Sequence, residues 1–209
     1  EPLSSQLSEV EIRARRDELF AMKRLQSVEG MTINSGKKNE VVLIGQVSAN
    51  LASNNARQIY AQVVGLNIYD SNDAGLQLNI GGRGLDPNRT SNFNTRQNGY
   101  DISADVLGYP ESYYTPPAEA LKEIQVIRGA AALQYGTQFG GLVNFVMHTP
   151  SKKSLELKLR NSVGSYGLIN NFLSLGGTNG KLSYYGYFQY KQGNGFRNNS
   201  EYAARNSYA

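Results

Sequence analysis

The residues of this chain that could do chemistry do not form a catalytic set. The sequence has no cysteine and one histidine, His148. It contains no Ser/His/Asp triad, HExxH motif, P-loop or dinucleotide-binding fingerprint. A lone histidine beside Thr149-Pro150 is more typical of a structural position than of a metal ligand. We therefore expect a protein that is not an enzyme and that carries no intrinsic metal or cofactor.

Side chains that could bind an anion are concentrated in one long, loop-rich stretch. Residues 85–117 contain Asp-Pro, Asn-Gly and Gly-Tyr-Pro turn signals. A loop of this length in a folded domain is usually functional or disordered, and the aromatic content of this one argues against disorder. Its candidate contact residues are Arg89, Arg96, Gln97, Tyr100, Tyr109, Tyr113 and Tyr114.

The composition narrows the class of partner. A hydrophobic content of 40% supports a folded core, and the net charge is +4. The basic residues are scattered rather than gathered in a stripe, so we do not expect a nucleic-acid partner. The lack of cysteine suits a protein of the cell envelope. No apolar run of about 18 residues occurs, so we expect no transmembrane helix.

The elements that must position the loops alternate along the first 150 residues. The patterns predict a strand at 40–45, a helix at about 55–64, strands at 66–70 and 76–80, a helical turn at 118–124, a strand at 124–129, a short helix at 130–136 and a strand at 142–147. The first helix would present Ala56, Ile59, Tyr60 and Val63 on one apolar face, with Ser53 or Asn54 as its cap. This alternation predicts a small domain that mixes strands and short helices.

After Pro150 the pattern changes to a two-residue period. In "LELKLRNSV" the residues Leu155, Leu157 and Leu159 alternate with charged side chains, and "LINNFLSLGG" and "LSYYGYFQYK" follow with the turn signal "TNGK" between them. Segments of about ten residues that alternate in this way are typical of an antiparallel membrane barrel. The alternative is a soluble sheet with one wet face. We expect the final "RNNSEYAARNSYA" to lie in an extracellular loop.

Several motifs in order resemble one known family. "EIQVIRGAAALQYGTQFGGLVNFV", "NIGGRG" and "NARQIYAQVVGLNI" resemble the plug domain of TonB-dependent outer-membrane receptors. "DPNRTSNFNTRQNGY", "GYPESYYTPPAEALKEI" and the strands after residue 164 are most similar to the ferric citrate receptor group. The resemblance covers about Glu9 to Arg197. Each motif alone is modest, and their order and spacing make the resemblance specific.

The resemblance implies an α+β plug domain, built from a small mixed sheet with short helices, followed by the first strands of a transmembrane β-barrel. We expect about three antiparallel strands in this chain. The implied divisions are an N-terminal periplasmic segment at 1–45, a plug at 46–150, and barrel strands with the start of an extracellular loop at 151–209. A plugged barrel of about 22 strands needs more than the 209 residues given, so we expect the chain to be part of a longer receptor.

The resemblance also assigns roles to residues. Glu9, Val10, Glu11, Ile12, Arg13 and Ala14 would form the TonB box, which adds a strand to the energy-coupling protein; an ordinary edge strand or linker is the alternative. Arg83 and Arg128, with Glu123 as a further candidate, would latch the plug to glutamates of the barrel wall, because a guanidinium binds carboxylate bidentately. The alternative is a surface arginine beside a turn glycine. The loops Leu85–Arg89 and Ile102–Thr115 would form the outward-facing plug apex, and the seven candidate contact residues would hold an anionic metal chelate through cationic and phenolic donors without stripping its metal. The alternative is that several of the tyrosines pack against the barrel wall.

The function implied by the resemblance is import of a ferric chelate across the bacterial outer membrane, with the N-terminus in the periplasm. The implied partners are the C-terminal domain of TonB with its inner-membrane motor complex, the ferric chelate and outer-membrane lipid. Two alternatives stay open. One is a subunit of a larger outer-membrane assembly. The other is an importer of a non-iron cargo such as a glycan or peptide, alone or with a surface lipoprotein. The sequence does not identify the cargo.

Overall fold

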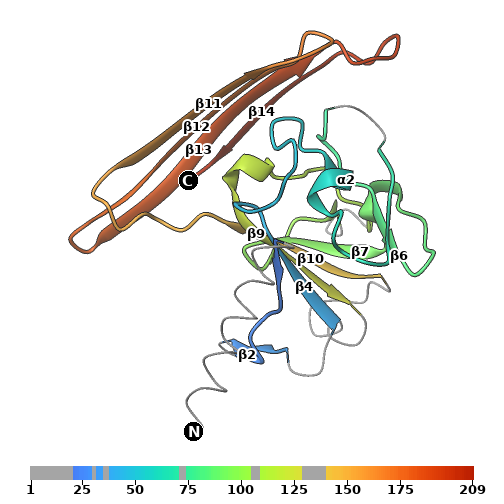
Figure 1. Ribbon diagram of the computed structural model, residues 1–209, viewed down its shortest axis with the longest axis horizontal. Helices are drawn as coiled ribbons and strands as arrows, with labels where there is room; N and C mark the ends of the chain where they lie inside the picture. The colour runs from blue at the N-terminus through green and yellow to red at the C-terminus, as the bar shows by residue number, and fades with distance from the viewer. Residues whose placement is uncertain (1–20, 30–31, 35–37, 71–73, 105–108, 129–139) are drawn as a thin grey trace, which may run out of the picture.

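A six-stranded mixed sheet organises the first two thirds of the chain (Figure 1). The structure, a computed structural model, describes residues 21–29, 32–34, 38–70, 74–104, 109–128 and 140–209. The strand order is β1 (Met22–Lys23), β4 (Lys38–Leu43), β9 (Leu121–Arg128), β10 (Gly141–Met147), β7 (Phe93–Gln97) and β8 (Tyr100–Asp101). The pair β10–β7 is parallel, and the other neighbours are antiparallel. We call the described residues 21–147 the N-terminal domain.

Short elements surround this sheet. Two further two-stranded pairs are β2 (Val28–Glu29) with β3 (Thr32–Ile33), and β5 (Leu66–Ile68) with β6 (Ile80–Gly82). The helical elements are α2 (Ala56–Ile59) and the 3-10 turns η1 (Asn88–Thr90) and η3 (Ala118–Ala120). The expectation of a small mixed sheet with short helices is confirmed. Residues 22–43, which the sequence analysis assigned to the N-terminal segment, contribute β1 and β4 to this sheet.

Burial explains why β9 and β10 lie at the centre. Ile124, Val126, Val143 and Phe145 are each at most 1% exposed. Strands buried on both faces carry near-continuous apolar residues, and the sequence of β10, GLVNFVM, follows this pattern. The same core includes Ile59 of α2 and reaches the inner face of the C-terminal strands. The core therefore joins the two parts of the chain.

Two predicted helices are wrong in extent. The helix expected over 55–64 is α2 alone, capped by Asn55, whose Oδ1 accepts a hydrogen bond from the Gln58 N–H at 3.0 Å. The helical turn expected over 118–124 is the 3-10 turn η3, and the chain is already in β9 from Leu121. Hydrogen bonds to β4 and β10 on both sides of β9 outweigh the weak local helix preference. The short helix expected at 130–136 lies outside the described residues.

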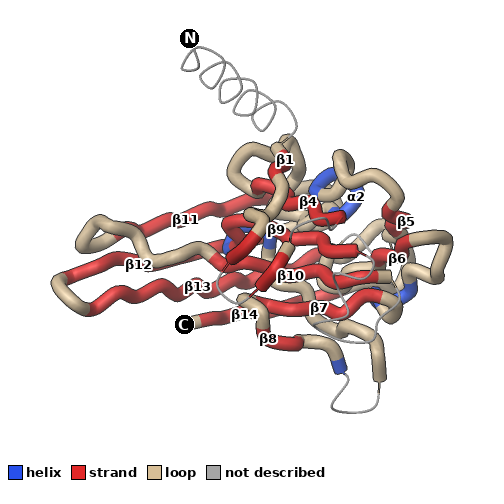
Figure 2. Tube along the Cα trace, turned by 90° about the horizontal axis from the view of Figure 1, so that it is seen from below, coloured by secondary structure: helices blue, strands red, loops and turns tan. Residues whose placement is uncertain are grey.

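The last part of the chain is a four-stranded antiparallel sheet, which we call the C-terminal sheet. Its strands are β11 (Glu156–Val163), β12 (Ile169–Asn179), β13 (Leu182–Gly193) and β14 (Tyr202–Tyr208), in that order (Figure 2). The first three were predicted. The expectation of about three strands and a terminal loop is wrong at β14. All of β14, Tyr202–Tyr208, pairs with Tyr187–Gly193 of β13, and its side chains alternate between the two faces.

The two faces of the C-terminal sheet differ in chemistry. The face that points away from the N-terminal domain carries exposed apolar side chains on β11, β12 and β13: Leu157, Leu159, Leu173, Leu175, Leu182 and Phe188. The opposite face carries buried polar and aromatic residues, including Asn170, Phe172 and Lys191. In the described part of the chain, no helix is long and apolar enough to cross a membrane.

Candidate functional site

Arg89 and Tyr113 form a pair on the surface of the N-terminal domain. The Arg89 Nη1 donates to the Tyr113 hydroxyl at 3.3 Å, and the Arg89 Cζ lies 5.1 Å from the centre of the Tyr113 ring. Arg89 has a left-handed backbone (φ 48°). The Asn79 Oδ1 accepts from the Arg89 N–H, and the Ser112 N–H donates to the Arg89 carbonyl, each at 2.8 Å. The backbone is therefore fixed while both side chains stay exposed.

Three other predicted contact residues lie in the β7–β8 hairpin, at the opposite end of β7 from η1. Arg96 donates to the Asn94 Oδ1 at 2.7 Å and to the Gly99 carbonyl at 2.6 Å. Gln97 pairs with Tyr100, whose side chain is 79% exposed. Partial burial alone would raise the pKa of Asp101, but hydrogen bonds from Ser103 and Asn94 and the charge of Arg96 hold that pKa below its ordinary value. Arg96 thus closes the hairpin.

The remaining two predicted contact residues also have different surroundings. Tyr109 is exposed, whereas Tyr114 turns toward the C-terminal sheet, where its hydroxyl lies 3.2 Å from that of Tyr187. Burial raises the pKa of the Tyr114 hydroxyl. The structure therefore brings together Arg89 with Tyr113, and Arg96 with Gln97 and Tyr100, but not all seven residues. Their role as ligand contacts stays a prediction.

The three predicted latch residues have these surroundings. Arg128 Nη2 lies 2.5 and 2.6 Å from the two carboxylate oxygens of Glu40, and its Nη1 donates to the Val64 carbonyl at 2.6 Å. Glu123 pairs with Lys23 at 2.7 Å. Partial burial would raise the pKa of Glu123, but Lys23 and Gln125 lower it below its ordinary value. Arg83 is exposed with a left-handed backbone (φ 58°). A latch to a barrel wall stays a prediction, and the predicted TonB box lies outside the described residues.

A polar contact between the N-terminal domain and the C-terminal sheet was missed by sequence reasoning. Glu119, whose side chain is 1% exposed, accepts from the Asn170 Nδ2 at 2.8 Å and lies 3.5 Å from the Arg160 Nη1. The Asn170 Oδ1 accepts from Gln189 at 2.8 Å, and Gln189 accepts from Asn206 at 3.0 Å. The sequence contained one signal for this contact: amide residues occupy the inward-facing positions of strands whose outward-facing positions are apolar.

A second buried contact links the two parts of the chain. The Lys191 ammonium donates to the Ala74 carbonyl, and Lys191 is 2% exposed. Nearby, Phe172, Tyr187 and Tyr208 stack across β12, β13 and β14, with ring centres 5.7 and 6.1 Å apart. The Lys191 contact therefore fastens the N-terminal domain to the inner face of the sheet, on which these stacked rings also lie.

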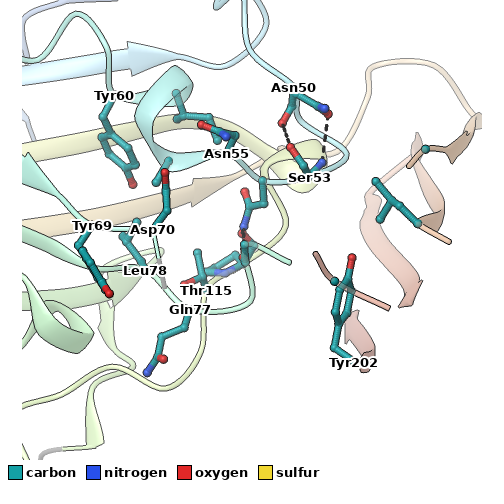
Figure 3. A pocket seen from close by; sticks show the side chains of 18 of the residues that line it. Asn50, Ser53, Asn55, Tyr60, Tyr69, Asp70, Gln77, Leu78, Thr115 and Tyr202 are labelled. Atoms are coloured by element: carbon teal, nitrogen blue, oxygen red, sulfur yellow. Dashed lines mark hydrogen bonds between the residues drawn. The ribbon is translucent and has the colours of Figure 1, made fainter. Parts of the chain in front are cut away.

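A pocket of about 630 Å³ lies between the N-terminal domain and two turns of the C-terminal sheet. One side is formed by residues around α2, by Tyr69 and Gln77, and by Thr115; the other is formed by the β11–β12 turn at 164–168 and by residues 195–202 (Figure 3). Asn54 joins the segments of the first side, because its amide donates to the Gly75 and Pro116 carbonyls and its Oδ1 accepts from the Ala118 N–H.

The described residues do not suggest a metal centre. No group of three or more His, Asp or Glu side chains that could hold a metal ion occurs among them. His148 is half-buried, and its ring meets that of Tyr185 edge-on, with centres 6.1 Å apart. Burial and the charge of Lys158 lower the pKa of His148. Its surroundings are those of a structural side chain.

Comparison with known proteins identifies the fold. The family model of the TonB-dependent receptor plug domain matches residues 34–142. Among solved structures, the chain is similar to the unliganded ferric citrate transporter FecA (22% identity, TM-score 0.57, 78% of this chain and 26% of that one). It is also similar to the siderophore receptor PirA from Acinetobacter baumannii (22%, 0.53, 74% and 24%) and to the copper transporter OprC (17%, 0.59, 83% and 27%). The chain spans about a quarter of the length of these structures.

Proposed function

The chain belongs to the TonB-dependent receptor plug-domain family, and on this premise we propose that it imports a ferric chelate through the outer membrane with energy supplied by TonB. The N-terminal domain is the plug, and the C-terminal sheet is the beginning of the surrounding barrel. The fold common to this chain and to transporters of ferric citrate, siderophore and copper supports a transport role rather than an enzymatic one. Neither a catalytic set in the sequence nor a metal cluster among the described residues competes with that role.

The observation that carries the chelate proposal is the exposed pair Arg89–Tyr113. A guanidinium held over a phenol ring presents several N–H donors and a positive charge to solvent from a fixed backbone. An anionic chelate can accept these hydrogen bonds through its own carboxylate or phenolate oxygens, so its metal ion need not be released. Because the guanidinium is already held in place before the ligand binds, less conformational entropy is lost on binding.

The test is uptake of radioactive iron by cells that carry the intact receptor. At chelate concentrations below saturation, Arg89→Ala is expected to lower uptake of ferric citrate or another anionic chelate by about tenfold or more, because binding loses a hydrogen bond to a charged group. Lys38→Ala, which removes an exposed cation from β4, is the matched control. Equal uptake in the two variants, across a panel of ferric chelates, would contradict the role of Arg89.

We also propose that residues 9–14 engage TonB as an added strand. Ile12→Pro removes a backbone N–H donor from that strand. Binding of the chelate to purified receptor should stay unchanged, while energised uptake stops. Ile12→Val, which keeps the donor and the β-branched shape, is the control. Full uptake by the proline variant would refute the assignment.

A further inference from the structure

We propose that a polar row on the outward face of the C-terminal sheet, the face that points away from the N-terminal domain, binds the phosphorylated headgroup of an outer-leaflet glycolipid. The row crosses all four strands and consists of Asn161, Asn171, Tyr190 and Arg205. The proposal rests on the placement of this sheet in the outer membrane, but not on the chelate or on TonB. It is argued from the strand register, the charge of the outward face and the position of the row.

The pairing of the strands places these four side chains next to one another. In the order given, each residue is the direct cross-strand partner of the next. Residues directly opposite each other in an antiparallel sheet point to the same face. Asn171 is exposed, whereas the residues before and after it in β12, Asn170 and Phe172, are buried on the inner face. The whole row therefore lies on the outward face.

The row interrupts a face that is otherwise apolar. Leu159 and Leu173 form the neighbouring cross-strand pair on one side of it. Val163 and Ile169 form the neighbouring pair on the other side. Polar side chains that face lipid are costly, and where they occur they are usually functional. A polar row between two apolar rows is therefore expected to meet a partner that offers hydrogen bonds.

Arg205 gives the row a positive charge that the sheet itself does not neutralise. By register, it is the one formally charged side chain at the outward positions of the described strands β11–β14. The Arg205 Cζ lies 5.7 Å from the centre of the Tyr190 ring, and the Tyr190 hydroxyl donates to the Gln192 Oε1 at 2.6 Å. Arg205 is exposed, so its N–H groups can reach an acceptor outside the protein. A guanidinium binds phosphate through two parallel hydrogen bonds.

The row lies near the outer end of the sheet. Asn171 is the third residue of β12, close to the β11–β12 turn at 164–168. That turn lines the pocket opposite Thr115, which belongs to a loop that faces outward in the proposed orientation. This end of the sheet lies at the top of the molecule in Figure 1, and β2 lies at the bottom. Arg205 can therefore reach the headgroups of the outer leaflet, because long cationic side chains extend toward the membrane surface.

The length of the row favours a large headgroup. Neighbouring strands are about 4.8 Å apart, so Asn161 and Arg205 are separated by three strand spacings, or about 14 Å. A glycerol phosphate headgroup is shorter than this. A phosphorylated disaccharide can place a phosphate on Arg205 and its hydroxyl or amide groups on the asparagines, whose side chains both donate and accept hydrogen bonds. Charge and length together point to a phosphorylated glycolipid.

The experiment is a lipid titration of the intact receptor in detergent, without a chelate, in which native mass spectrometry measures the bound lipid. The probes are diphosphorylated lipid A and phosphatidylglycerol. We expect lipid A to bind saturably, and Arg205→Gln should weaken this binding about tenfold. Arg205→Lys keeps the charge and should recover part of the affinity. Lys181→Gln, which removes an exposed cation from the β12–β13 turn at the other end of the sheet, is the matched control and should have no effect.

A second variant tests the length of the site. Asn161→Leu should weaken lipid A binding about fivefold, because it removes a hydrogen bond at the end of the row far from Arg205. It should leave phosphatidylglycerol binding unchanged, because the shorter headgroup does not extend that far. Both side chains are exposed, so the variants should keep the heat-dependent gel migration of the folded receptor. Weaker lipid binding would then not reflect unfolding.

Each possible result either supports or overturns the proposal. It is overturned if lipid A does not bind saturably, or if Arg205→Gln binds it as tightly as Lys181→Gln does. Equal weakening of both lipids by Asn161→Leu would overturn the assignment to a glycolipid. A receptor dimer that Arg205→Gln dissociates would assign the row to a second copy of the chain instead. Chelate uptake by Arg89→Ala is a separate measurement, so failure of either proposal can be told from failure of the other.

Discussion

Arg128 holds β9 to its neighbours through one guanidinium group. It contacts both oxygens of Glu40 on β4 and the carbonyl of Val64 after α2, while its Nε is buried without a partner among the described residues. The Arg128 and Glu40 side chains are 15% and 26% exposed, so solvent screens the pair only partly. If one member of this pair is removed, the charge of the other stays partly buried without its partner and without full hydration, which costs free energy of folding.

Arg128→Met should therefore loosen β4. We expect a loss of about 2 kcal/mol in the local free energy of opening, seen as faster amide hydrogen exchange over 38–43. Arg57→Met breaks the more exposed pair with Asp70 and is the control, with an expected change within about 0.5 kcal/mol. Equal exchange in the two variants would show that the Arg128 pair adds no more than a surface contact.

The hairpin of β7 and β8 should depend on acid through Asp101. Its folded pKa is lowered, so the carboxylate stabilises the hairpin at pH values above its ordinary pKa of about 4, and this contribution is lost as the pH falls through the lower folded value. Protection of the Ser103 amide, which donates to Asp101 at 2.8 Å, should fall in that acidic range when its exchange rate is compared with that of an unstructured peptide at the same pH. Asp101→Asn should remove this pH dependence. A dependence that persists in the variant would assign it to another group.

At the scale of elements, the decisive contact is where η3 meets β12. The buried carboxylate of Glu119 is satisfied by Asn170, which is itself held by Gln189 on β13. A buried network of this kind is favourable only when every member is paired. The contact therefore fixes how the N-terminal domain sits on the C-terminal sheet.

Asn170→Ala should release that contact. We expect a loss of about 2–3 kcal/mol, because the Glu119 carboxylate would stay buried without its shortest hydrogen bond. Hydrogen exchange over 118–121 in the intact receptor measures the change. Asn171→Ala, one residue along β12 on the exposed face, is the matched control and should exchange like the unchanged protein. Protection of 118–121 in Asn170→Ala would mean that Arg160 alone can hold the carboxylate.

At the scale of the whole molecule, the two faces of the C-terminal sheet have different surroundings. Leu159, Leu173 and Phe188 lie side by side on adjacent strands and point away from the N-terminal domain. Such a face is suited to lipid, whereas the buried amides on the other face are suited to the domain that they contact. This arrangement accounts for a sheet that is apolar on its exposed side.

Arg introduced on this face should hinder insertion in a way that depends on depth. Leu173→Arg, near the middle of β12, should destabilise the receptor in lipid by about 2–4 kcal/mol, and Leu182→Arg, beside the β12–β13 turn, by at most about 1 kcal/mol. Folding into lipid vesicles, followed by urea titration, compares the two. A cost that is the same at both positions would contradict a membrane-facing role for the sheet.

The sequence predicted what local periodicity controls. Two-residue alternation located β11, β12 and β13, and the apolar run after Gly141 located β10. Prediction from the sequence failed where pairing with distant strands determines the element. β9 begins at Leu121 because β4 and β10 flank it, and β14 forms because β13 offers a free edge. The partners of Arg128 and Glu119 lie 88 and 51 residues away, beyond any spacing rule. Tyr60 was predicted to lie on the apolar face of a helix, and that pattern gave no sign that its buried hydroxyl would lack a hydrogen-bond partner among the described residues.

If the receptor is energised from its N-terminus as we propose, the strand order has a mechanical consequence. Among the strands of the six-stranded sheet, β1 and β4 come first in sequence, and they occupy one edge of that sheet. A pull on the N-terminus would reach the two-residue β1 first, then the β2–β3 pair and then β4, so the load would break one ladder at a time instead of shearing the whole sheet at once. The Lys23–Glu123 and Arg128–Glu40 pairs would be successive points of resistance along that path. Force could thus unravel this edge while the Glu119 and Lys191 contacts keep the rest of the domain anchored to the C-terminal sheet.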